Sequence, residues 1–123
     1  MTRHAEQIAS VLHRSVQAVL TEGLHDPRVR GLVSVTKVQL SSDLADATVF
    51  VSVLPEEHAP LTMHGLKHAA PHVRATVGRS IDLRRVPRLT FKLDRSLKKA
   101  AELDAALSEG VDADDPALEA EES

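Results

Sequence analysis

The sequence contains no cysteine, tryptophan or tyrosine, and only two phenylalanines. Without cysteine, the chain has no disulfide, no thiol nucleophile and no thiolate metal ligand. The shortage of aromatic side chains leaves little for recognising single-stranded RNA by base stacking. Phe50 and Phe91 both lie in apolar, strand-like segments, and we interpret them as core residues rather than as stacking platforms.

Long apolar runs are also missing. No stretch approaches the roughly 18 consecutive apolar residues that a membrane span needs. The first residues, Met1 to His4, lead directly into amphipathic sequence without the apolar region of a signal peptide. A length of 123 residues suits one domain. We therefore expect a cytoplasmic protein with no membrane partner.

The formal net charge of −3 conceals an uneven distribution of charge. All 15 Lys and Arg residues lie at or before Lys99, and residues 1–100 contain only 9 of the 18 acids. Residues 101–123 contain the other 9 acids and no Lys or Arg. A basic domain followed by an acidic tail is typical of proteins with nucleic-acid partners.

The pattern of apolar residues predicts the first helix and three strands. Apolar side chains at steps of three and four residues predict a helix over residues 3–22, which Gly23 can end. Val33–Leu40 and residues 47–54 are rich in β-branched residues and alternate, which is typical of strands. Leu89–Leu93 has the same pattern and is the third predicted strand.

A proline divides the central helical segment. We predict a short helix over residues 61–70, interrupted by Pro71, because proline inside a helix removes a hydrogen bond. The expected kink is Ala69-Ala70-Pro71, followed by a second helix from His72 to about Arg79.

The C-terminal part predicts one more helix and a tail. Residues 95–108 have a polar helical pattern, and residues 109–123 are acidic and poor in large apolar groups, which predicts disorder. We therefore expect a domain over residues 1–108 and a tail over 109–123. The predicted fold is α+β, in the order α-β-β-α-kink-α-β, with helices on one face of a three-stranded sheet.

This order resembles a type II KH domain, and three segments narrow the resemblance to the ribosome-binding factor A family. The match covers roughly residues 3–107. The segments that carry it are His25–Val29 (HDPRV), Val35–Leu54 with its SDL turn, and Leu83–Phe91 (LRRVPRLTF).

The resemblance implies a ribosome assembly factor that binds the small (30S) ribosomal subunit and its 16S rRNA. It further implies assistance in 5′-end rRNA processing and late subunit maturation, including adaptation to cold. A monomer is implied, with no cofactor and no small-molecule substrate. The family builds its interhelical kink on Ala-x-Gly, whereas this chain has Ala69-Ala70-Pro71, so residue 71 offers no N–H to RNA.

A basic cluster late in the chain contains the candidate RNA-binding residues. Guanidinium groups match phosphate oxygens in bidentate geometry, and Asp82 is the only acid within the run from Arg74 to Arg88. A solvated charged face is the alternative interpretation; the resemblance favours RNA. The candidate residues are Arg74, Arg79, Arg84, Arg85, Arg88 and Lys92.

Three histidines, His64, His68 and His72, recur at four-residue steps. The first pair has a spacing found in zinc sites, but Pro71 separates His72 from them, and no nearby carboxylate or cysteine completes a ligand set. We expect no metal site and solvent-facing histidines.

Other functions remain as alternatives. The phosphate-binding and nucleophile motifs of common enzymes are missing, and Asp26, Asp43 and Asp46 lie in predicted turns, so we expect no enzyme. A small enzyme on this scaffold would need a pocket with convergent polar groups. A general KH-type RNA-binding protein is another alternative. The acidic tail could also fold back onto the basic face, although a solubilising tail is the simpler interpretation.

Overall fold

The computed structural model describes residues 2–96 and residue 103. Two long helices, one short 3-10 helix and three strands follow one another along this part of the chain. In order, they are α1 (Arg3–Glu22), β1 (Leu32–Leu40), β2 (Asp46–Leu54), η1 (Glu56–His58), α2 (Ala59–Ser80) and β3 (Arg88–Leu93).

Helix α1 begins and ends where the sequence predicts. The Thr2 hydroxyl accepts a hydrogen bond from the Ala5 N–H at 3.1 Å, which satisfies one of the free donors of the first turn. Gly23 ends the helix with a positive φ of 94°. Ile8, Leu12 and Val16 are buried at steps of four residues and form the stripe that faces the sheet.

The sheet has the order β1-β2-β3. Strands β1 and β2 form an antiparallel hairpin, with a register shift between Val35 and Lys37. Strand β3 pairs in parallel with β2, and α2 makes the crossover between them. The parallel pairing places both strands with their first residues together, so Asp46 lies opposite Arg88.

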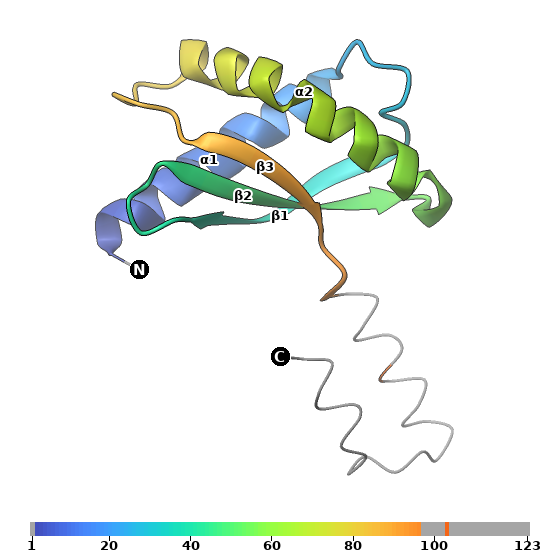
Figure 1. Cartoon of the computed structure of the whole chain (residues 1–123), viewed down its shortest axis with the longest axis horizontal. Helices are drawn as coiled ribbons and strands as arrows, with labels where there is room; N and C mark the ends of the chain where they lie inside the picture. The colour runs from blue at the N-terminus through green and yellow to red at the C-terminus, as the bar shows by residue number, and fades with distance from the viewer. Residues whose placement is uncertain (1, 97–102, 104–123) are drawn as a thin grey trace.

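Both helices pack on one side of the sheet (Figure 1). Side chains of a strand alternate between the two faces of the sheet, so every second residue of β2 and β3 points toward the helices and is buried. The most deeply buried large side chains include Leu12, Leu66, Val49 and Phe91. The predicted α+β fold, with helices on one face of three strands, is confirmed.

The two phenylalanines lie on opposite faces. Phe91 has no exposed surface and belongs to the core, as predicted. The prediction for Phe50 is wrong: it alternates with buried Val49 and Val51, so its partly exposed ring lies on the face away from the helices. There the ring meets Lys37, whose Nζ is 5.5 Å from the ring centroid.

The predicted pair of short helices is a single helix. Helix α2 runs continuously over Ala59–Ser80 with Pro71 inside it, so the predicted break at Ala69-Ala70-Pro71 is wrong. Proline removes one backbone hydrogen bond, but the pyrrolidine ring is exposed and the packed side of the helix continues past it. Leu66, Ala70, Val73 and Val77 are buried at steps of four, three and four residues. This uninterrupted contact with the sheet keeps both halves helical.

The loop between α1 and β1 is held against α2. The fully buried Thr62 hydroxyl accepts from the Arg30 N–H at 3.2 Å and lies 3.0 Å from the Arg30 carbonyl oxygen. A Cβ added at Gly65 would come within 2.9 Å of the Val29 side chain. Gly31 has a φ of 79°, and a Cβ there would lie 2.4 Å from the Leu54 carbonyl oxygen. Glycine is therefore required at residue 31.

The predicted helix over 95–108 and the tail over 109–123 lie almost entirely outside the described residues. Among the described helices, none is both long enough and apolar enough to cross a membrane.

Candidate nucleic-acid interface

The six predicted RNA-binding residues fall into two separate groups. Arg74 and Arg79 lie in the second half of α2, Arg84 and Arg85 follow in the loop, and Arg88 begins β3. These five residues share one end of the molecule, which we call the arginine end. Lys92 lies four residues farther along β3, about 13 Å from Arg88 at the rise of a strand. It therefore belongs to a different part of the surface.

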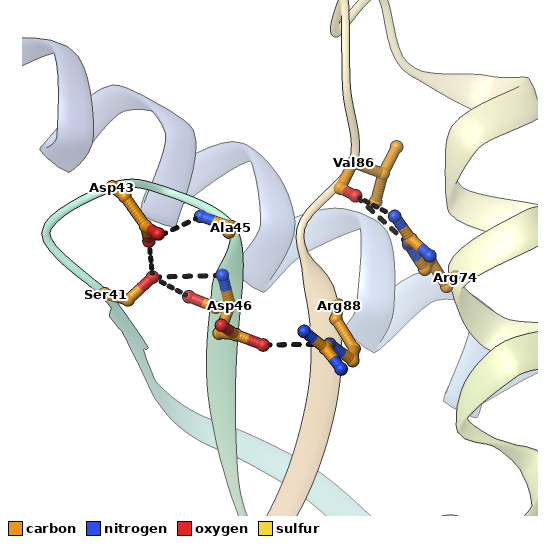
Figure 2. Close-up of polar contacts among 7 residues, drawn as sticks. All are labelled: Ser41, Asp43, Ala45, Asp46, Arg74, Val86 and Arg88. Carbon is orange, nitrogen blue, oxygen red and sulfur yellow. Dashed lines mark hydrogen bonds and ion pairs between the residues drawn. The ribbon is translucent and has the colours of Figure 1, made fainter.

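The β1–β2 hairpin turn borders the arginine end (Figure 2). The Ser41 hydroxyl donates to the Asp43 carboxylate at 2.7 Å, and the Ala45 N–H donates to the same carboxylate at 3.1 Å. The Asp46 N–H donates to Ser41 Oγ at 3.0 Å. The hydrogen bond from Ser41, then that from Ala45, lowers the pKa of Asp43. The turn therefore presents an ionised carboxylate in a fixed position.

Arg74 holds the loop between α2 and β3. Its Nε and one terminal nitrogen donate to the Val86 carbonyl oxygen at 3.1 and 2.8 Å (Figure 2). The side chain is half-buried. Two hydrogen bonds from a charged donor to a loop carbonyl fix the backbone that carries Arg84 and Arg85. Arg74 therefore positions the other arginines.

Arg88 is tied to the hairpin turn twice. Its N–H donates to the Ala45 carbonyl oxygen at 2.9 Å, and its Nε lies 3.0 Å from Asp46 Oδ1. The two side chains of the ion pair are 72% and 51% exposed. Exposed ion pairs contribute only about 0–1 kcal/mol, so the Arg88 guanidinium can exchange Asp46 for a phosphate at little cost.

Arg79, Arg84 and Arg85 are exposed. Arg79 donates to the Thr76 hydroxyl at 3.2 Å, whereas neither Arg84 nor Arg85 has a hydrogen-bond or ion-pair partner within the described residues. Arg85 lies close enough to Asp43 to contribute to its lowered pKa. Arg84 and Arg85 are thus the arginines of this end most available to an anionic partner.

Sequence reasoning missed the acids that neighbour these arginines. Asp82 is the only acid within the run itself, but Asp46 and Asp43 approach from the hairpin turn. The single acid within the run therefore does not describe the surroundings of Arg88, which pairs with Asp46 from the neighbouring strand. A signal was present: a strand–helix–strand crossover makes β2 and β3 parallel neighbours, which brings Asp46 beside Arg88.

The Asp26-Pro27-Arg28 segment forms a turn closed by its own side chains. Asp26 accepts from the Arg28 N–H at 2.9 Å and from the Arg28 guanidinium at 3.0 and 2.6 Å. These bonds lower the pKa of Asp26 to about 2. The turn role expected for Asp26 is confirmed, and the Arg28 fork is occupied by this carboxylate.

His64, His68 and His72 are all exposed on α2, so their predicted orientation toward solvent is confirmed. Within the described residues, no three His, Cys, Asp or Glu side chains gather closely enough to hold a metal ion. The acids with shifted pKa values, Asp26, Asp43 and Asp94, all shift downward through hydrogen bonds in turns and strand ends. Carboxylates held ionised in this way are suited to structural roles rather than to proton transfer.

Comparison with known proteins identifies the family. The model of the family described as "Ribosome-binding factor A" matches residues 4–107. Ribosome-binding factor A of Clostridioides difficile is 40% identical over 102 residues, which cover 82% of this chain and 79% of that protein. The protein of the same name from a Cyanothece strain is 38% identical over 130 residues, covering 98% of this chain and 97% of its own length.

Structures of relatives have a similar fold. The crystal structure of ribosome-binding factor A from Thermus thermophilus superimposes with a TM-score of 0.62 at 30% identity, covering 74% of this chain and 97% of that one. A Thermus thermophilus homology model fitted into the cryo-EM map of a 30S–RbfA complex gives a TM-score of 0.58 at 31% identity, with 71% and 91% covered. The expected KH-like fold is thereby confirmed, and the chain belongs to the ribosome-binding factor A family.

Proposed function

We propose that this protein is a ribosome assembly factor that binds the small (30S) ribosomal subunit through its 16S rRNA and catalyses no reaction. One observation carries the proposal: the loop after α2 presents Arg84 and Arg85 without partners among the described residues, and Arg74 holds that loop in place. Preorganised guanidinium groups suit phosphate oxygens. The fitted 30S complex of the Thermus relative supports the same kind of partner for this chain.

Charge and shape account for the proposed binding. Phosphate contacts supply most of the sequence-independent affinity for nucleic acid and fix the orientation of a protein on it. At the arginine end, Arg79, Arg84 and Arg85 supply exposed charge, and Arg88 adds a fourth when it exchanges Asp46 for a phosphate. Specificity then comes from the shape of the folded rRNA that these groups meet.

The finer parts of the proposal concern what binding achieves. We place the protein in the cytoplasm as a monomer that assists 5′-end processing of 16S rRNA and late maturation of the subunit, including in the cold. Cells without the protein are then expected to accumulate small-subunit RNA with an extended 5′ end, most of all at low temperature. Primer extension on that RNA measures the effect, and a normal 5′ end at every temperature would contradict this part.

Sedimentation with isolated ribosomal subunits tests the binding proposal. The full-length protein is expected to pellet with small subunits and not with large ones. Arg84→Glu/Arg85→Glu is expected to abolish pelleting because it replaces two phosphate-binding charges by repulsive ones. Arg3→Glu/Arg14→Glu is the matched control, since it makes the same change of charge on exposed positions of α1.

The outcomes separate the alternatives. Equal binding to both subunits would leave a general RNA-binding protein, and no binding by the wild-type protein at low salt would remove the ribosome as partner. Equal loss in both double variants would mean that net charge matters, rather than the arginine end.

A further inference from the structure

The face of the sheet away from the helices carries a row of three side chains that the arginine end does not explain. The strand register places Lys37 on β1 opposite Phe50 on β2, and Phe50 opposite Lys92 on β3. Lys37 and Lys92 are exposed, and Phe50 is partly exposed. An aromatic ring thus lies at the centre of the sheet with a cation on each side.

Of the two phenylalanines in the chain, Phe50 alone has a ring that a binding partner can contact. The sequence has no Trp or Tyr, and its other phenylalanine, Phe91, is fully buried. The contact that Phe50 makes on this face is with Lys37, whose Nζ lies 5.5 Å from the ring centroid. A cation–π contact at an exposed site is weak, so Lys37 can move from the ring to a phosphate.

Neighbouring rows supply hydrogen-bonding groups. Thr48 lies opposite both Gln39 and Thr90 in the register, which places an amide and two hydroxyls beside the phenylalanine row. Two acids also lie on this face. Asp46 alternates with Thr48 and Phe50 along β2 and pairs with Arg88, and the Asp94 carboxylate accepts from the Thr36 hydroxyl and from the Ser96 N–H. Lys37, Lys92 and Arg88 therefore stand against two carboxylates, and both carboxylates already have donors on the protein.

A hollow continues the surface past Lys92. It has a volume of about 560 Å³ and lies between the first turns of α2 and the end of β3. Lys67, Lys92 and Arg95 line it together with Glu56, over an apolar floor that includes Met63 and Leu93. A ligand that extends from Phe50 past Lys92 therefore meets further cations, which favours a polyanion as the ligand of this face.

We propose that the open face of the sheet binds an unpaired segment of RNA, with one base stacked on Phe50 and the flanking phosphates held by Lys37 and Lys92. A sheet face with an accessible aromatic ring and flanking cations is a general way of holding single-stranded nucleic acid. This second RNA-binding surface rests on the proposed function, because it assigns to the same RNA partner a further region, which meets the arginine end at Arg88.

Binding of short single-stranded RNA to the full-length protein tests the stacking interaction. Fluorescence anisotropy with labelled ten-nucleotide oligo(U) and oligo(A) at low salt is expected to show about tenfold weaker binding for Phe50→Leu, within the range of stacking on one ring. Phe50→Trp is expected to retain the affinity. Leucine keeps an apolar residue at a position outside the core, and a thermal unfolding scan verifies that the variant is folded.

The lysines have their own variant and control. Lys37→Gln/Lys92→Gln is expected to weaken binding and to lower the dependence on salt by roughly 0.7 in log–log slope for each phosphate that the variant no longer binds. Arg3→Gln/Arg14→Gln removes the same charge from α1, on the other side of the sheet, and is expected to leave the binding nearly unchanged. Equal affinities of Phe50→Leu and wild type would overturn the proposal.

Photo-crosslinking on the small subunit identifies the occupant in the complex. A benzoylphenylalanine in place of Phe50 is expected to crosslink to rRNA, whereas the same probe in place of Ala18 on α1 is not. A crosslink only to a ribosomal protein, a crosslink only to the acidic segment 101–123 of the same chain, or none at all, in a protein that still pellets with small subunits, would overturn the second RNA-binding surface and leave the proposed function intact. A wild-type protein that bound neither small subunits nor the oligonucleotides would remove both proposals.

Discussion

The two faces of the sheet use the same residue types for opposite purposes. Phe91 fills the centre of the core between the strands and the helices, whereas Phe50, in the neighbouring strand, meets a lysine on an open face. A similar difference in burial separates Thr62 of α2 from the exposed Thr90 of β3, and the half-buried Arg74 from the exposed Arg84. A side chain that is held by its partners stabilises the fold, and one that is exposed is available for binding. Paired substitutions can test this difference.

The largest difference is expected between the phenylalanines. Phe91→Ala is expected to lower the free energy of unfolding by about 3–5 kcal/mol, because it leaves a cavity in a packed core. Phe50→Ala is expected to cost about 1 kcal/mol or less, since the ring is only partly buried. Urea unfolding followed by circular dichroism measures both. Equal losses would mean that the two faces are packed alike.

A smaller difference is expected between the threonines. Thr62→Val keeps the shape of a fully buried side chain but leaves the Arg30 N–H without its acceptor, at a cost of about 1–3 kcal/mol. Thr90→Val, on the open face, is expected to change stability by less than about 0.5 kcal/mol. The same urea titration measures both variants. A neutral Thr62→Val would show that the loop is not held through this hydroxyl.

The arginines should separate stability from binding. Arg74→Gln is expected to destabilise the fold by about 1 kcal/mol, because the Val86 carbonyl loses two charged donors. Arg84→Gln is expected to leave stability unchanged and to weaken binding to small subunits. Thermal unfolding and sedimentation are performed on both variants. An Arg84→Gln variant that unfolded earlier than wild type, or that bound small subunits as tightly as wild type, would contradict this division.

The smallest effect concerns pH. The pKa of Asp26 is lowered to about 2 by its bonds to Arg28, so its carboxylate stabilises the fold above its usual pKa, and this contribution is lost as the pH falls from about 3.8 towards 2. Asp26→Asn is therefore expected to be less stable than wild type at pH 6 and to approach it below pH 4. Asp82→Asn, in the exposed loop, is the control. A difference in the free energy of unfolding between Asp26→Asn and wild type that stays constant down to pH 2.5 would contradict a stabilising ion pair between Asp26 and Arg28.

Helix α1 and the three strands were predictable from local sequence patterns because each has one clear period. The three- and four-residue steps predict α1 over residues 3–22, as observed, and alternation predicts the strands to within one residue of their observed ends. The continuous α2 was not predictable in the same way. The effect of Pro71 depends on whether packing on either side holds the helix, and that packing comes from the sheet.

The sequence predicts candidate residues for the site but not their arrangement. The arginine run marks the charged end, but only the fold divides Arg74 from Arg84 and moves Lys92 to another surface. Phe50 was misassigned because both faces of β2 carry apolar or β-branched residues, so alternation alone does not say which face is buried. The buried face is the one on which the two helices pack.

The salt dependence of binding to isolated small subunits tests the central claim most directly. The claim is that exposed arginines in the loop after α2 bind rRNA phosphates. Over about 50 to 200 mM salt, the log of the wild-type association constant is expected to fall linearly with the log of the salt concentration. For Arg84→Gln/Arg85→Gln the slope is expected to be shallower by roughly 0.7–0.9 for each phosphate that the variant no longer binds. An unchanged slope and affinity in this variant would contradict the account.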